Sequence, residues 1–331
     1  MAPLLDVAAS STEQQWYYSH QELQQSPSIA AGLRPSDERK ARQDAIKFVW
    51  KLKDGLGVRQ SVVTTAATFI HRFYMRESVQ TWDVLLLAGA ATFLACKNEE
   101  EPRSIKLLVQ LLMDIRRNPT GRIEAKGHHI DRNNPAFDPL RSKLVACEEA
   151  LLRVLCFDLT VRDPHWIALK AVKKSWANEP ERADKVGRVG WSFLNDSLAA
   201  PLCLLYRPHL LAAAAILLAC AQLNLPLPER PPSLEMQKTI FYTENEAEEG
   251  EEPPSFEPEV WWLELLDVKP EELRNPVLDL VGEYKFAEDE FVVEQGAKLA
   301  NLVQPLLASF HQTQATAAVP PATSAAVDPS A

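Results

Sequence analysis

The chain has 331 residues, 46% of them hydrophobic, and a formal net charge of −10. This length suffices for two domains of ordinary size. The acidic balance argues against direct binding of nucleic acid, which favours a basic face, and no apolar run is long enough to span a membrane.

The N-terminal region divides into two segments. Residues 1–15 show no helical pattern and are expected to be disordered, and they lack the basic start and apolar run of a signal peptide. Residues 16–34 begin with three successive aromatics, Trp16-Tyr17-Tyr18, and are expected to form an arm. These aromatics suit an arm that is pinned onto a domain surface, and they would also suit contact with a partner.

Residues 35–160 are expected to form a first helical domain. Apolar residues at helical spacing predict five helices, at about 35–55, 60–75, 82–97, 102–117 and 139–157. The polar loop 118–137 contains His128-His129. Neither Cys nor a third His keeps metal-ligand spacing with this pair, so we expect no metal site there.

The third of these helices organises the domain. Between Val84 and Cys96 it carries no charge, and a helix that is apolar on every side must be surrounded by others. A similar segment returns 124 positions later, at 210–221. Such self-similarity indicates two copies of one helical unit. The copies differ at the end of the segment, where Lys97 is matched by Ala221.

Residues 161–285 are expected to form the second domain. Asp163-Pro164 is typical of a capped helix start. Further helices are predicted at about 181–198, 208–223, 258–266 and 270–284. A Pro-rich and acidic insertion covers about 224–257, and its acidic run, 244–259, holds eight Glu. Residues 286–311 could form a C-terminal helix, and 312–331 are a low-complexity tail that we expect to be disordered.

One carboxylate is placed unusually on the fifth helix. At 100° per residue, Glu148 falls about 40° from Leu144, within the apolar stripe, whereas Glu149 falls about 140° away. Such a carboxylate is costly unless a cation or backbone donors satisfy it. Lys97 is a candidate neighbour. The simpler interpretations are that Lys97 complements the helix dipole and that Glu148 lies at the rim of its stripe.

The sequence shows no pattern of a catalytic site. It has neither a Gly-rich phosphate loop after a strand nor a G-x-S-x-G segment. The five cysteines lie in apolar runs without metal-ligand spacing, which is typical of a reduced, intracellular protein. We therefore predict a binding protein without a cofactor rather than an enzyme.

Several motifs carry a resemblance to transcriptional cyclins of the cyclin T and cyclin K group. His71 to Met75 reads HRFYM, and an apolar helix ending in LACKNEEEP follows it. The segment from Glu148 to His165, EEALLRVLCFDLTVRDPH, resembles the end of a first cyclin box. WYYSHQELQQSPSIAAGL resembles the segment before that box, and Trp261-Trp262 matches a tryptophan-rich helix of the second. The likeness covers about residues 16–285.

The resemblance implies an all-α fold with two tandem five-helix cyclin boxes, an N-terminal arm and a disordered C-terminal tail. It also implies a nuclear regulatory subunit that binds and activates a cyclin-dependent kinase. That kinase would phosphorylate the RNA polymerase II C-terminal domain during elongation. By motif position, Lys97 and Glu148 would bind the kinase αC helix. Phe157 would contact the kinase too, although a core residue would look the same.

The chain also departs from the wider family. Cell-cycle cyclins carry an Asp where this chain has His71, so Arg42 cannot form the same bridge to it. Their M-R-A-I-L docking patch is replaced at residues 41–45, so substrate recruitment by that patch is not expected.

Four alternatives remain open. A cyclin L-like splicing role or a cyclin C-like Mediator role belongs to the same class. A TFIIB-type factor also has tandem cyclin boxes but binds DNA, and the absence of N-terminal zinc-binding cysteines counts against it. The last alternative is a helical scaffold without a kinase.

Overall fold

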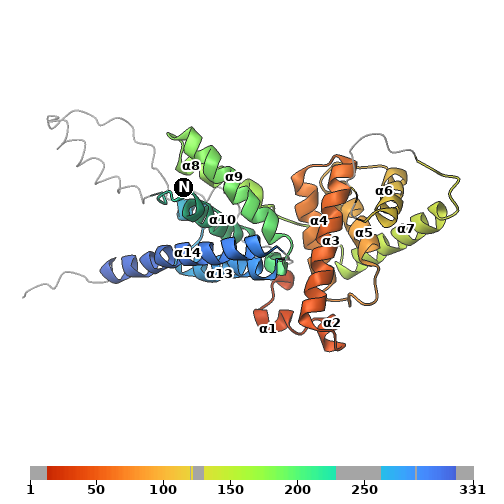
Figure 1. The fold of residues 1–331 in the computed structure, drawn as a ribbon, viewed down its shortest axis with the longest axis horizontal. Coiled ribbons are helices and arrows are strands. Elements are labelled where there is room, and N and C mark those ends of the chain that lie inside the picture. The colour runs from red at the N-terminus through yellow and green to blue at the C-terminus, as the bar shows by residue number, and fades with distance from the viewer. Residues whose placement is uncertain (1–12, 120, 122–129, 229–261, 288, 318–331) are drawn as a thin grey trace, which may run out of the picture.

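The computed structural model describes residues 13–119, 121, 130–228, 262–287 and 289–317. Within these residues the secondary structure is entirely helical. The helices form two units that lie side by side, with the N-terminal arm below their junction (Figure 1). Each unit has its own cluster of buried apolar residues. None of the helices found in the described residues is long and apolar enough to cross a membrane.

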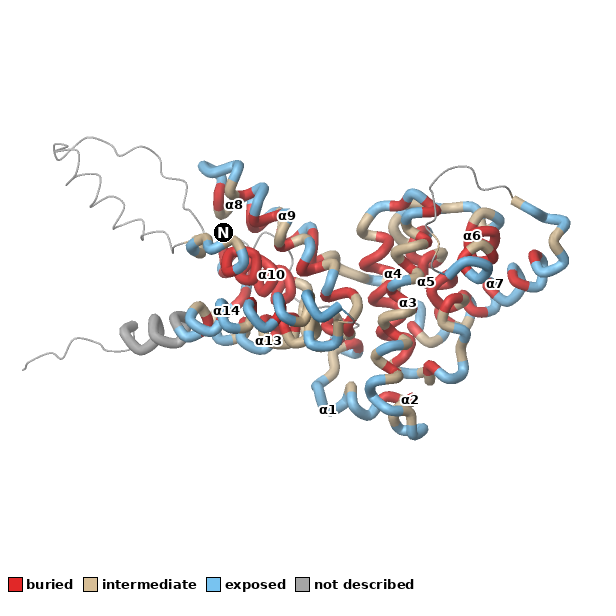
Figure 2. Tube along the Cα trace, viewed as in Figure 1, coloured by how far each residue is buried: buried red, intermediate tan, exposed pale blue. Residues whose placement is uncertain are grey.

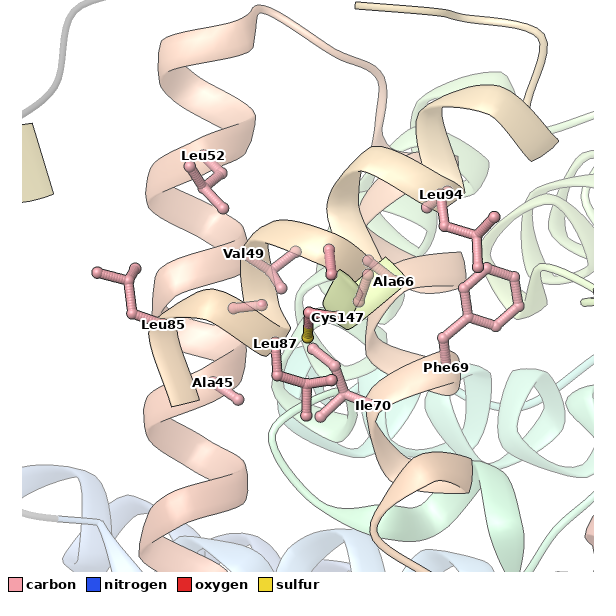
Figure 3. Packing of buried hydrophobic residues seen from close by; sticks show 14 of the residues in the cluster. Ala45, Val49, Leu52, Ala66, Phe69, Ile70, Leu85, Leu87, Leu94 and Cys147 are labelled. Carbon is pink, nitrogen blue, oxygen red and sulfur yellow. The ribbon is translucent and has the colours of Figure 1, made fainter. Parts of the chain in front are cut away.

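The first unit is built around α5 (Val84–Asn98). Four helices surround it: α3 (Pro35–Leu56), α4 (Gln60–Phe73), α6 (Ile105–Arg117) and α7 (Phe137–Val154). All four pack against α5. Leu87 of α5 is fully buried among Val49 of α3, Ile70 of α4 and Cys147 of α7 (Figure 3). The sequence of α5 is therefore apolar around most of its circumference because four helices pack against it, as expected.

Local signals explain where most of these helices begin and end. Asp83 caps α5, since its carboxylate accepts the N–H of Leu86 at 2.8 Å. Gly57 ends α3 with a φ of 61°, a conformation that glycine adopts at little cost. The start of α6 was predicted at Pro102 but lies at Ile105. The side chain of Arg103 instead reaches back to the carbonyls of Leu56 and Gly57, at 3.0 Å each, and holds this segment against the end of α3.

The second unit repeats this plan around α10 (Pro208–Leu223), whose side chains are buried from residue 209 to residue 221. Its helices are α8 (Pro164–Ser175), α9 (Pro180–Ser197), α12 (Trp262–Leu265), α13 (Arg274–Glu283) and α14 (Glu290–Ala317), with short 3₁₀ helices η2 (Pro201–Leu204), η3 (Pro270–Leu273) and η4 (Tyr284–Phe286). Helices α8, α9, α13 and α14 all pack on α10. The tube representation shows the same buried centre in both units (Figure 2).

The ends of the chain differ from the sequence-based expectation. Residues 13–15, expected to be disordered, belong to the 3₁₀ helix η1 (Glu13–Trp16). Glu13 is buried and pairs with Arg162 at 3.4 Å, a contact that no local pattern reveals. The C-terminal helix runs to Ala317 rather than stopping near 311, so the first residues of the expected tail are helical. Residues 1–12, 122–129, 229–261 and 318–331 lie outside the described residues, and with them the acidic run, His128-His129 and Trp261.

The N-terminal arm contacts both units. It contains α1 (His20–Leu23) and α2 (Pro27–Ala30). The N–H of Tyr18 donates to the carbonyl of Leu204 in the second unit at 2.8 Å. On the first unit, the hydroxyl of Ser28 accepts the N–H of Val79 at 3.0 Å. The arm therefore helps to fix the orientation of one unit against the other.

A buried polar network, centred on Arg42, joins the arm to both units. The Arg42 guanidinium contacts the Glu38 carboxylate at 2.6 Å, and both side chains are buried. It also donates to the carbonyls of His71 and Tyr74, at 3.1 Å each. From the arm, the Ser26 hydroxyl donates to Glu38. Arg42 thus pairs with Glu38, a carboxylate on its own helix. The guanidinium therefore needs no Asp at position 71, which explains how the chain accommodates His71 there.

His71 extends this network to the second unit. Its Nδ1 faces Arg42 Nη1 at 3.4 Å and must accept, because arginine can only donate. Its Nε2 therefore carries the proton and donates to the carbonyl of Leu198 at 2.9 Å. Burial, together with the charge of Arg42, lowers the pKa of His71 to about 3. The imidazole is neutral in the folded protein at physiological pH.

We expect Arg42→Met to lower the free energy of unfolding by about 3–5 kcal/mol, because it leaves the buried Glu38 carboxylate without its cation. The double variant Arg42→Met/Glu38→Met should lose less, since it leaves no buried charge unpaired. Urea unfolding followed by circular dichroism measures both. A single variant within about 1 kcal/mol of the parent would contradict this account of the network.

We also expect the protein to become less stable as the pH is lowered, because His71 is buried in its neutral form. The unfolded chain takes up the proton near pH 6.5, whereas the folded chain resists it until about pH 3. Stability is therefore lost progressively below about pH 6.5, by up to about 1.4 kcal/mol per pH unit. His71→Gln keeps an N–H donor but does not titrate, so its unfolding free energy should decline less steeply over this range. Parallel curves for the two proteins would show that His71 does not contribute.

Candidate functional site

Lys97 and Glu148 meet at the surface of the first unit. Lys97 lies in the last turn of α5, and Glu148 lies on α7. The Lys97 Nζ atom is 2.7 Å from Glu148 Oε1. Because α5 and α7 pack along each other, the end of the buried helix brings the lysine to the carboxylate. The proximity proposed from the sequence is therefore present, whereas the role of the two residues remains a prediction.

The two side chains differ in exposure. The Glu148 side chain is only 10% exposed, whereas that of Lys97 is 47% exposed. A carboxylate buried to this degree needs a partner, and Lys97 supplies one. Lys97 has three donors and uses one on Glu148. Its other donors can reach an incoming carbonyl or carboxylate while the Glu148 contact persists.

Phe93 is a further member of this site that the sequence interpretation missed. The Lys97 Nζ atom lies 4.1 Å from the centre of the Phe93 ring, a cation–π geometry. Phe93 precedes Lys97 by four residues, and residues at this spacing share a helix face. That spacing was the signal available in the sequence. The ring limits the conformations of the lysine and offers a partly exposed apolar surface beside it.

Phe157 lies just beyond the C-terminus of α7. Its side chain is exposed, with 70% of the residue surface accessible, so it is not a core residue. Phe157 has a φ of 58° and the preceding Cys156 has a φ of 53°. Left-handed backbone costs a non-glycine residue about 1–2 kcal/mol. Two such residues in succession indicate that surrounding contacts impose this turn on the chain.

Those contacts come from three directions. Within the turn, the N–H groups of Cys156 and Phe157 donate to carbonyls of α7, at 3.0 Å each. From the turn that follows α4, Arg76 donates to the Val154 carbonyl at 2.9 Å. From the arm, the indole of Trp16 donates to the Asp158 carboxylate at 2.9 Å, and its ring lies 4.3 Å from the Arg76 guanidinium. The turn that presents Phe157 is therefore rigidly supported.

This arrangement suits binding rather than catalysis. It combines a half-exposed cation, a largely buried carboxylate and an exposed aromatic ring, and within these described residues it contains no pair of groups placed for acid–base or nucleophilic chemistry. Among the described residues, no cluster of three or more His, Cys, Asp or Glu side chains could hold a metal ion.

Comparison with known proteins relates the chain to one family. Residues 13–160 match the cyclin N-terminal domain. The chain is 29% identical to rice cyclin-T1-3, over 82% of this chain and 49% of that protein. It is 30% identical to cyclin pch1 of Schizosaccharomyces pombe, over 62% of this chain and 57% of that protein. It is 28% identical to human cyclin-K, over 62% of this chain and 33% of that protein. The chain spans about half the length, or less, of the curated relatives that it matches.

Solved structures share the fold. A chain of the CAK complex from Chaetomium thermophilum superposes with a TM-score of 0.56, at 17% identity and 97% coverage of both chains. A chain of the yeast RNA polymerase II CTD kinase complex CTDK-1 gives 0.55 at 14% identity, with 92% of this chain and 83% of that chain covered. Together with the matched relatives, the helical units above lead to one assignment: residues 13–160 form a cyclin N-terminal domain, in a chain that is similar to cyclins of the cyclin T and cyclin K group.

Proposed function

We propose that this chain is the regulatory subunit of a transcriptional cyclin-dependent kinase, which it binds through Lys97, Glu148 and Phe157. The observation that carries the proposal is the Lys97–Glu148 contact of 2.7 Å at an accessible edge of a cyclin domain. Phe93 adds an aromatic surface beside Lys97. The partner would be a helix of the kinase, the αC helix, whose polar groups reach the exposed donors of the lysine.

The chain would act on the kinase by shifting its conformational population. A protein kinase needs its αC glutamate paired with the lysine that holds the ATP phosphates. A cyclin that binds the inward position of αC more tightly than the outward one favours the active state by that difference in affinity. The chain itself would supply no catalytic group.

The substrate and the location of the complex belong to the same proposal. We infer that the kinase phosphorylates the RNA polymerase II C-terminal domain and that the complex acts in the nucleus, in the control of elongation. Support comes from the relatives, which are cyclins T and K, and from a structural neighbour that belongs to an RNA polymerase II CTD kinase complex. Contact with the polymerase would be indirect, through the kinase.

The decisive first experiment is affinity purification of the tagged chain from native extract. We expect a cyclin-dependent kinase to co-purify, with activity on C-terminal-domain repeats that vanishes when the chain is depleted. Co-purification of general transcription factors without a kinase, together with a salt-sensitive shift of duplex DNA, would favour the TFIIB-type alternative instead.

With the partner kinase identified, we expect Lys97→Ala or Glu148→Ala to weaken its binding by about 2–5 kcal/mol, the cost of leaving a buried charge without its partner. Isothermal titration calorimetry measures the affinity. Glu149→Ala is a matched control, because this exposed neighbour on α7 pairs with Arg153 rather than with Lys97. Unchanged affinity in both site variants, with circular dichroism showing an intact fold, would refute the assignment.

Phe157→Ala separates kinase contact from folding. Because the ring is exposed, its removal should change the free energy of unfolding by less than about 0.5 kcal/mol. The affinity for the kinase should nevertheless fall, since a buried aromatic anchor contributes on the order of 2 kcal/mol to an interface. Trp166→Ala in α8 is the control, as another exposed aromatic residue, in the second unit. An equal loss of affinity in both variants would indicate a nonspecific effect.

A further inference from the structure

A basic hollow lies between the end of α6 and the start of α7, at the opposite end of the molecule from α14 (Figure 1). Its volume is about 310 Å³. Three cations line it, Arg116, Arg117 and Lys143, and the buried side chains of Met113 and Leu140 contribute apolar surface. None of the described residues that line this hollow is acidic. It therefore combines positive charge with an apolar wall.

The three cations are held to different degrees. Arg116 is fixed by Asp83, with 2.9 Å between Nη2 and Oδ2. Arg117 approaches Asp114 only at 3.9 Å, and its side chain is 70% exposed. Lys143 is exposed on the second turn of α7. One guanidinium is thus pre-oriented, while the other two side chains can turn toward a ligand.

The charge of the surrounding unit favours an anion. The whole chain is acidic, yet residues 35–160 contain 20 Lys and Arg against 16 Asp and Glu. The net charge of the first unit is therefore positive although that of the chain is −10. An anionic ligand is attracted to this unit and repelled by the rest of the molecule.

We infer that this hollow binds a phosphorylated serine or threonine in a segment of a partner protein. A phosphate carries a charge of about −1.5 to −2, which can compete with the Asp83 and Asp114 carboxylates for Arg116 and Arg117 and can also bind Lys143. A guanidinium group can donate two parallel hydrogen bonds to two oxygens of a phosphate. A phosphate offers three such oxygens and a carboxylate only two, so a phosphate matches three surrounding cations better. The apolar wall accepts the side chain next to the phosphorylated residue. A single hollow of this size suits one phosphate, whereas a nucleic acid needs a basic track along its backbone.

The hollow is separate from the proposed kinase site. Lys143 precedes Glu148 by five residues, which places it about 7.5 Å away along α7 and about 140° around its axis. A phosphorylated segment and a kinase helix can therefore occupy α7 together. The inference does not depend on kinase binding, and its failure would leave the proposed function untouched.

The test is binding of the peptide fluorescein-Ala-Pro-phosphoserine-Pro-Leu-amide, which carries the dye at its N-terminus, to the full chain by fluorescence anisotropy. Arg117→Ala/Lys143→Ala should lower the affinity at least tenfold, because it removes two of the three cations. Arg116 is kept, since its contact with Asp83 supports the cap of α5. The matched control is Lys173→Ala/Lys174→Ala, which removes two exposed lysines of α8 and should bind like the parent.

Four further probes distinguish between possible ligands of the hollow. The unphosphorylated peptide and a peptide with Glu in place of phosphoserine should bind at least tenfold more weakly. Equal binding of all three peptides, or equal binding by the double variant and the parent, would overturn the inference. So would a result in which inorganic phosphate alone displaces the peptide at equal concentration, or in which single-stranded RNA binds more tightly and depends on the same two residues.

Discussion

The structure depends on the burial of two apolar helices, α5 and α10. Neither has a polar face, so each must be covered on every side, and the covering helices have no freedom to pack elsewhere. Leu87, Ala88, Ala90 and Ala91 of α5 have no accessible surface. The small residues let the neighbouring helices approach closely, and dense packing then fixes their positions. The positions of α3, α4, α6 and α7 in the first unit therefore follow from their packing on α5.

The proposed kinase site illustrates the consequence. Lys97 lies in the last turn of the buried helix, where the covering helices no longer enclose it. Its position relative to α7 is therefore determined by core packing rather than by the ion pair itself. A pair with one partner half exposed contributes little to stability after solvent screening. The Lys97–Glu148 pair is held on two packed helices, so it suits recognition of a partner protein better than stabilisation of the fold.

Much of this architecture could be predicted from the sequence because its determinants are local. The uncharged run from Val84 to Cys96 predicted the central helix, and Asp163-Pro164 predicted the start of α8 with its aspartate cap. Glu148 was singled out because helical geometry placed a carboxylate within an apolar stripe. In each case the determining residues lie within a few turns of one another.

The features that escaped prediction depend on contacts between distant segments. Glu13 is ordered by Arg162, 149 positions further along the chain. The start of α6 is displaced because Arg103 binds the end of α3. The left-handed turn at Cys156 and Phe157 is supported by Trp16 and Arg76, and its own sequence contains no glycine to signal it. Such contacts exist only once the units have packed.

The two units share a plan, yet only the first can hold a charged pair at this position. Ala221 stands where the first unit has Lys97, and it is only 7% exposed, within the apolar cluster of the second unit. An ammonium group there would be desolvated, at a cost of several kcal/mol unless it found a partner. The first unit exposes the same end of its central helix, so a lysine is tolerated. The asymmetry between the copies therefore follows from how each covers one helix end, and it confines the proposed kinase contact to the first unit.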